Sequence, residues 1–107
     1  MFSVRQVYDA PEIEIAKELI RGALKRYWTV SVFAGDKWTI EKSRSSRDIF
    51  KAMFLAETEK LRFRTMIGKF VGDIVLCYGD SEDVIFDWSN RYEIKELVAS
   101  IRGVPLQ

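Results

Sequence analysis

The chain has 107 residues, of which 48% are hydrophobic and 31% are charged, and its formal net charge is +1. This length suits one domain, residues 1–107, whose ends at 1–8 and 104–107 we expect to be loosely held, and the hydrophobic fraction excludes a wholly disordered chain. Histidine is absent and cysteine occurs once, which excludes histidine-based catalytic systems, internal disulfides and cysteine-rich zinc sites.

Residues 11–27 are predicted to form the first helix. Apolar side chains recur there at spacings of three and four, as at Ile13, Ala16 and Ile20. Asp9 can cap the free amides at the start, and Pro11 suits the first turn because its missing N–H is not needed there. Acidic residues come early in the segment and basic residues late, an order that complements the helix dipole.

Two strands joined by a hairpin turn follow, at 28–34 and 38–42, because both segments are rich in β-branched and aromatic residues. Gly35-Asp36 marks the turn. A two-residue turn places Trp38 and Ile40 on the polar side of the first strand, whereas an odd-length loop or a bulge places both on its apolar side. We favour the odd loop or bulge, because a one-residue slip exchanges faces and this register separates apolar from polar residues better.

The middle of the chain predicts one more helix and two strands. Ser45 and Asp48 form a capping-box-like start for a second helix, which runs to about residue 58. Alternation with a period of two predicts a strand at 61–65, with Arg62 and Arg64 on its outer face. The mostly apolar segment 70–78 predicts a central strand.

The last third of the chain predicts a strand and a final helix. The strand covers 84–88, and Ser89 or Asn90 caps the helix, whose apolar residues recur at i, i+3, i+4 and i+7. Gly103 and Pro105 end it. The order is therefore α-β-β-α-β-β-β-α. Short connections between consecutive strands imply antiparallel pairing, so the fold class is α+β: an antiparallel sheet of about five strands with helices packed mainly on one face.

Charge is unevenly distributed along the chain. Residues 1–69 carry 14 Lys or Arg against 9 Asp or Glu, whereas residues 70–107 carry 3 against 7. The net charge of +1 is thus the remainder of +5 and −4. Such asymmetry is typical of a surface for nucleic acid or another acidic partner, and it is equally compatible with an ordinary solvated surface.

The basic part of the chain contains a candidate site for an anion or nucleic acid. Backbone amides, serine hydroxyls and guanidinium groups near the start of the second helix suit a phosphate or carboxylate, and Trp28 and Trp38 are candidates for stacking on bases. Against this hypothesis, the favoured register places both tryptophans on the core face, and no known nucleic-acid-binding motif is present. The candidate residues are Lys42, Arg44, Arg47 and Lys51, extended by Arg62 and Arg64.

Aromatic residues make up 13% of the chain, which is more than one small core needs. The strand patterns leave Phe33, Ile85 and Tyr78 as candidates for the second face of the sheet, with Phe86 on the core face. Apolar side chains on both faces indicate that one face meets a protein partner, or a second copy of the chain. The alternative is that the final helix covers them.

The leading functional hypothesis is a small non-enzymatic interaction or regulatory module that acts through a sheet face or edge, of the kind found among accessory proteins of bacteria and mobile elements. The alternative is nucleic-acid or anion binding. A third hypothesis places a divalent metal at Asp80, Glu82 and Asp83, although their spacing matches no known metal loop. We expect no cofactor and no catalytic residues. We also expect no membrane partner and a cytoplasmic location, because no apolar run approaches the ~18 residues that span a bilayer.

Overall fold

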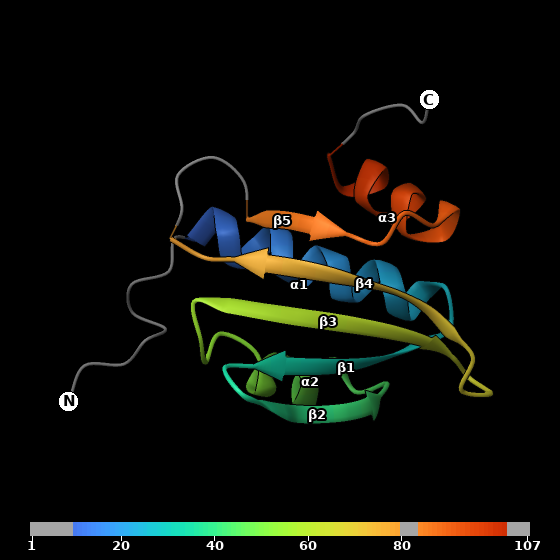
Figure 1. Cartoon of the computed structure of the whole chain (residues 1–107), viewed down its shortest axis with the longest axis horizontal. Helices are drawn as coiled ribbons and strands as arrows, with labels where there is room; N and C mark the ends of the chain where they lie inside the picture. Colours follow the sequence, from blue (N-terminus) through green and yellow to red (C-terminus); the bar gives the residue numbers. More distant parts are fainter. Residues whose placement is uncertain (1–9, 80–83, 103–107) are drawn as a thin grey trace.

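The computed structural model describes residues 10–79 and 84–102, and it contains a five-stranded antiparallel sheet with three helices (Figure 1). This confirms the predicted α+β class and the predicted order of elements. The strands lie in the order β2-β1-β3-β4-β5. The elements are α1 (Ala10–Lys25), β1 (Trp28–Ala34), β2 (Lys37–Ser43), α2 (Ser46–Ala52), β3 (Thr58–Thr65), β4 (Phe70–Cys77), β5 (Ile85–Trp88) and α3 (Tyr92–Arg102).

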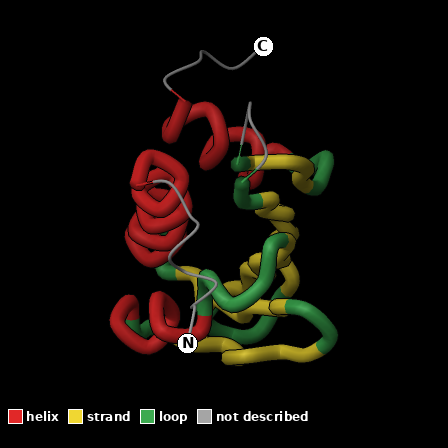
Figure 2. Tube along the Cα trace, turned by 90° about the vertical axis from the view of Figure 1, so that its left-hand side faces the viewer, coloured by secondary structure: helices red, strands yellow, loops and turns green. Residues whose placement is uncertain are grey.

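All three helices lie on the same side of the sheet, which Figure 2 shows nearly edge-on. The core forms between this side and the helices, because the alternate residues of each strand that face the helices are apolar. Among its fully buried side chains are Phe63, Leu61 and Ile74 from the central strands. None of the described helices covers the other side of the sheet, which we call the open face. In the part of the chain that the structure describes, no helix has the length and apolar character needed to cross a membrane.

The second helix is shorter than predicted, because it ends at Ala52 rather than near residue 58. Met53 adopts an extended conformation and Phe54 a left-handed one, with φ of 64°. Both side chains are nevertheless buried. These two apolar residues, which predicted a longer helix, therefore belong to a buried turn. The strand β3 begins at Thr58, three residues earlier than predicted.

The first hairpin has a two-residue turn, with Ala34 opposite Lys37. The expected odd-length loop is therefore wrong, whereas the bulge given as its alternative is present. An extra residue in β2 does shift the register beyond Trp38, so that Ile40 lies opposite Val32 and packs against the core. Trp38 comes before this bulge and stays opposite Phe33 on the open face. The bulge thus separates two side chains that the sequence pattern placed together.

Candidate functional site

The open face carries a row of aromatic and arginine side chains. Figure 1 looks onto this face, with the helices behind the sheet. Alternation along β3 turns Arg62 and Arg64 toward it while the residues between them are buried. Trp38 of β2 and Phe70 of β4 approach from either side. We call Trp38, Arg62, Phe70, Arg64 and Arg91 the arginine–aromatic strip.

Arg62 is the centre of this strip. Its Nε lies 2.9 Å from Oδ1 of Asp73 and its Nη2 lies 3.1 Å from Oδ2, a two-pronged ion pair between β3 and β4. The central carbon of the guanidinium also lies within cation–π distance of two rings, 5.2 Å from the centre of Trp38 and 5.4 Å from that of Phe70. The hydrogen bond to Asp73 raises the pKa of Arg62 against the opposing effect of burial, and the charge of Asp73 adds to the rise. The guanidinium is therefore charged and fixed in orientation.

Trp38 approaches Arg62 diagonally across β1, because Trp38 lies opposite Phe33 and Arg62 lies opposite Ser31, two residues away on that strand. Ser31 of β1 lies opposite Arg62 and is buried, and its hydroxyl accepts a hydrogen bond of 2.8 Å from the backbone N–H of Lys42. A larger residue at position 31 would occupy the space that the indole and guanidinium share. On the far side of Trp38, Phe33 packs edge-on at 5.2 Å between ring centres.

Phe70 joins the strip to the end of β5. The guanidinium of Arg91 lies 5.4 Å from its ring centre and that of Arg64 lies 6.0 Å away. The chain beyond β5 is held in place by Ser89, whose hydroxyl accepts from the backbone N–H of Asp73 and whose own N–H donates to the carbonyl of Asp73, both at 2.9 Å. Arg91 follows two residues later, so β4 and the β5–α3 connection position it together.

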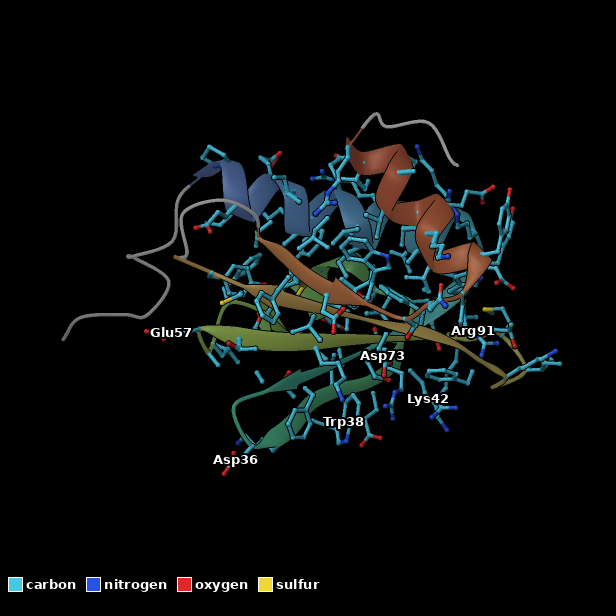
Figure 3. All side chains as sticks on the ribbon, turned by 45° about the horizontal axis from the view of Figure 1, so that its top comes forward. Asp36, Trp38, Lys42, Glu57, Asp73 and Arg91 are labelled. Carbon is cyan, nitrogen blue, oxygen red and sulfur yellow. The ribbon has the colours of Figure 1, made fainter. Side chains whose placement is uncertain are left out.

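The structure separates the basic residues that the sequence grouped into one site. Arg62 and Arg64 lie on the strip, and Figure 3 shows Lys42 and Trp38 along β2, the edge strand that lies away from α1 and α3. Arg44 instead donates to the carbonyl of Trp28 at 2.8 Å and to that of Leu24 at 3.3 Å. It therefore fixes the end of α1.

No anion site forms at the start of α2. The hydroxyl of Ser45 accepts from the backbone N–H of Asp48, so the cap already satisfies that amide. Arg47 is almost fully exposed beside Asp48, and Lys51 borders a shallow depression between α2 and β2. The six basic residues thus lie on several elements, and their role as a binding site stays a prediction.

Two of the three predicted interface residues are buried in the core. Tyr78 is 4% exposed and Ile85 is 2% exposed, so neither can contact a partner. An irregularity in the pairing of β4 with β5 turns Ile85 inward and leaves Phe86 66% exposed, the reverse of the predicted orientation. Phe33 alone lies on the open face, half-buried against Trp38.

Sequence reasoning missed Phe70 and Arg91 as members of the strip. Phe70 follows the turn at Gly68, and pairing across that turn places it opposite Arg64. That pairing was the available signal, because a hairpin turn sets which residues face each other. No pattern in the sequence indicates Arg91, since its position depends on contacts between β4 and the connection to α3.

The proposed metal ligands Asp80, Glu82 and Asp83 lie outside the described residues. Within residues 10–79 and 84–102, no three acidic or cysteine side chains come together as a metal site would require. No family model, no curated protein and no solved structure matches the chain. The interpretation of the open face therefore starts from its own geometry.

Proposed function

We propose that this protein is a non-enzymatic binding module that binds nucleic acid on the open face of its sheet. The observation that carries the proposal is Arg62, held by Asp73 between the rings of Trp38 and Phe70. Aromatic rings and guanidinium planes are the groups on which proteins stack nucleic-acid bases. Binding rather than catalysis agrees with a sequence that lacks histidine.

The charges of the open face favour a polyanion. Lys60, Arg62 and Arg64 project from alternate positions of β3, and Arg91 joins them at the end of the strip. Asp73 is paired with Arg62, which leaves Lys60, Arg64 and Arg91 as the basic groups available around the rings. Lysine and arginine contacts to phosphates supply most of the sequence-independent affinity for nucleic acid.

The position of Trp38 removes the main argument that the sequence raised against this function. The indole was expected on the core face, where it could not contact bases. Because the bulge in β2 follows Trp38, the ring stays on the open face and is half-exposed beside Arg62. The aromatic and basic components of a nucleic-acid surface therefore occupy one face.

The edge strands of the sheet are poorly suited to pairing with another strand, which favours the open face over an edge as the binding surface. β2 has two irregularities in its pairing with β1, and Lys42 within it has φ of 51°. β5 at the other edge has only four residues. Bulges and short strands are the features that prevent an edge from pairing with another strand.

The test is fluorescence anisotropy with labelled mixed-sequence oligonucleotides at 50 and 200 mM salt. The R64E/R91E double variant should bind at least tenfold more weakly than the wild type, and wild-type affinity should fall with salt. The matched control is K25E/R47E, which makes the same charge change on the helical side of the molecule. The proposal is overturned if the wild type does not bind at 50 mM salt, or if the control loses as much affinity.

A protein partner, including a second copy of the chain, is the second candidate for the same face. The observation that favours it is the group of half-buried apolar side chains beside the strip: Phe33, Val75 and Cys77. Tryptophan and arginine are also the residues most enriched at the centres of protein interfaces. Sedimentation velocity should then show a concentration-dependent dimer that F33E abolishes, and a monomer at all concentrations would rule out self-association.

A further inference from the structure

We infer that the nucleic acid is single-stranded, and that its bases stack on the arginine–aromatic strip while its phosphates contact Lys60, Arg64 and Arg91. This inference deepens the proposed function and rests on it. Within the described residues, Arg62 is paired with a carboxylate, unlike Arg64 and Arg91. Asp73 engages two nitrogens of Arg62, and the side chains of this pair are only 28% and 21% exposed.

Arg62 is therefore a stacking group rather than a phosphate ligand. Asp73 occupies the Nε–Nη2 edge of the guanidinium and neutralises its charge, and the side chain is only 28% exposed. What the side chain contributes is a flat, charged group within cation–π distance of two rings. A flat, sequence-tolerant surface of this kind recognises the faces of bases.

Duplex nucleic acid cannot use this surface, because its base faces are covered by neighbouring base pairs. A duplex presents phosphates and groove edges, and contacts to those need charged and polar groups rather than half-exposed indole and phenyl rings. In a single strand the bases are free to turn toward a protein and stack on aromatic side chains. The rings of Trp38 and Phe70 thus discriminate between the two forms.

The length of the strip determines how many bases can stack on it at once. It crosses four adjacent strands, from Trp38 on β2 to Phe70 on β4. Strands in a sheet are roughly 4.8 Å apart, so this distance is about 14 Å. Sheets of this width that bind RNA stack about two or three bases. Lys60 and Arg64 lie along β3 on either side of Arg62, where they can contact the phosphates that join such bases.

The experiment compares labelled 12-nucleotide oligo(dT) and oligo(rU) with a 12-base-pair duplex, using the full chain at 50 mM salt. Single strands should bind at least tenfold more tightly than the duplex. W38A should weaken single-strand binding by roughly five- to a hundredfold, the effect of losing one stacked base, and should leave duplex binding unchanged. W38F, which keeps a ring, should retain intermediate affinity. Y27A, which removes an exposed aromatic ring just after α1, is the control, and circular dichroism verifies that each variant is folded.

The possible outcomes separate the two proposals. Equal affinity for duplex and single strand, with no effect of W38A, overturns the inference and leaves nucleic-acid binding intact. Absence of binding to all three probes overturns both. Loss of self-association in W38A without any binding to the oligonucleotides would assign the face to a second copy of the chain. Preference for oligo(dT) or for oligo(rU) supports the inference and identifies the sugar.

Discussion

The hydroxyl of Tyr78 donates a hydrogen bond of 2.9 Å to Oε1 of Glu59, and both side chains are buried. The same carboxylate accepts from the backbone N–H of Phe54 at 2.9 Å and from that of Leu55 at 2.8 Å. Glu59 is thus a structural anchor: it fixes the turn that ends α2 and draws Tyr78 into the core. Residue 78 is therefore unable to contribute to the open face.

We expect Glu59→Ala to lower the free energy of unfolding by about 3–5 kcal/mol, because it removes three buried hydrogen bonds to a charged acceptor. Tyr78→Phe removes one of them and should cost about 1–2 kcal/mol. Urea denaturation measures both. The exposed neighbour Glu57 is the control, and Glu57→Ala should change stability by less than about 0.5 kcal/mol. Equal effects at positions 57 and 59 would contradict the anchoring role of Glu59.

Gly72 sets the distance between β4 and α3. A Cβ atom at this position would lie 2.4 Å from Cγ1 of Ile94, close to the backbone of α3. Gly72→Ala should therefore move the helix and cost about 1–3 kcal/mol. In an Ile94→Ala background the same change should cost much less, and thermal denaturation of the double-mutant cycle measures this coupling. Additive effects would show that the two residues do not limit the approach of α3.

Gly22 of α1 offers a matched comparison with Gly72. Its Cβ would lie 2.6 Å from Cδ1 of Leu97, the flexible end of a side chain. Alanine also favours a helix over glycine by about 1 kcal/mol. We therefore expect Gly22→Ala to leave the melting temperature nearly unchanged. A loss as large as that of Gly72→Ala would mean that Leu97 has no room to rotate.

Arg44 and Arg64 should respond in opposite ways to substitution by alanine. Arg44→Ala removes hydrogen bonds to two backbone carbonyls at the end of α1 and should cost about 1–2 kcal/mol of stability, with no change in binding to oligonucleotides. Arg64→Ala should weaken binding about two- to tenfold and change stability by less than about 1 kcal/mol. Chemical denaturation and anisotropy, measured on both variants, make the comparison. If the Arg44→Ala variant is folded but binds oligonucleotides more weakly, Arg44 belongs to the binding surface after all.

Tyr27 follows α1 in a left-handed conformation, with φ of 62° and 71% of its surface exposed. Its N–H donates to the carbonyl of Leu24 at 3.0 Å, as in a helix C-cap. Glycine adopts this conformation without steric cost, so Tyr27→Gly should be about 1 kcal/mol more stable than Tyr27→Ala. Both variants lose the contact of the ring with Arg44, so the difference in their stability measures the cost of the left-handed backbone conformation. Equal stability of the two variants in urea denaturation would contradict this cost.

The elements of the fold could be predicted because local patterns identify them. The helical spacing around Ile20 and the alternation through Leu61 and Phe63 each have one period, and both elements form where that period predicts. The prediction that the second helix reaches residue 58 was wrong. The apolar residues Met53 and Phe54 continue the helical pattern in the sequence, but in the structure they are buried in a turn. The anchor that breaks the helix, Glu59, gives no local signal.

The candidate site was only partly predictable. Alternation along β3 correctly turned Arg62 and Arg64 away from the core. The position of Trp38 depends on where β2 bulges, and a shift of one residue exchanges the two faces of a strand. Arg44 lies close to Arg47 in the sequence, yet it joins the end of α1 to the start of β1, because tertiary packing brings the carbonyls of Leu24 and Trp28 to it.

The sequence by itself determined the α+β class, the order of the elements and the absence of histidine-based chemistry, since these follow from composition and from periods of two and 3.6 residues. Only the tertiary structure decided which basic side chains share a surface. That choice depends on bulges, strand order and the pairing of Arg62 with Asp73, and each of these joins residues distant in the chain through contacts that no local pattern encodes.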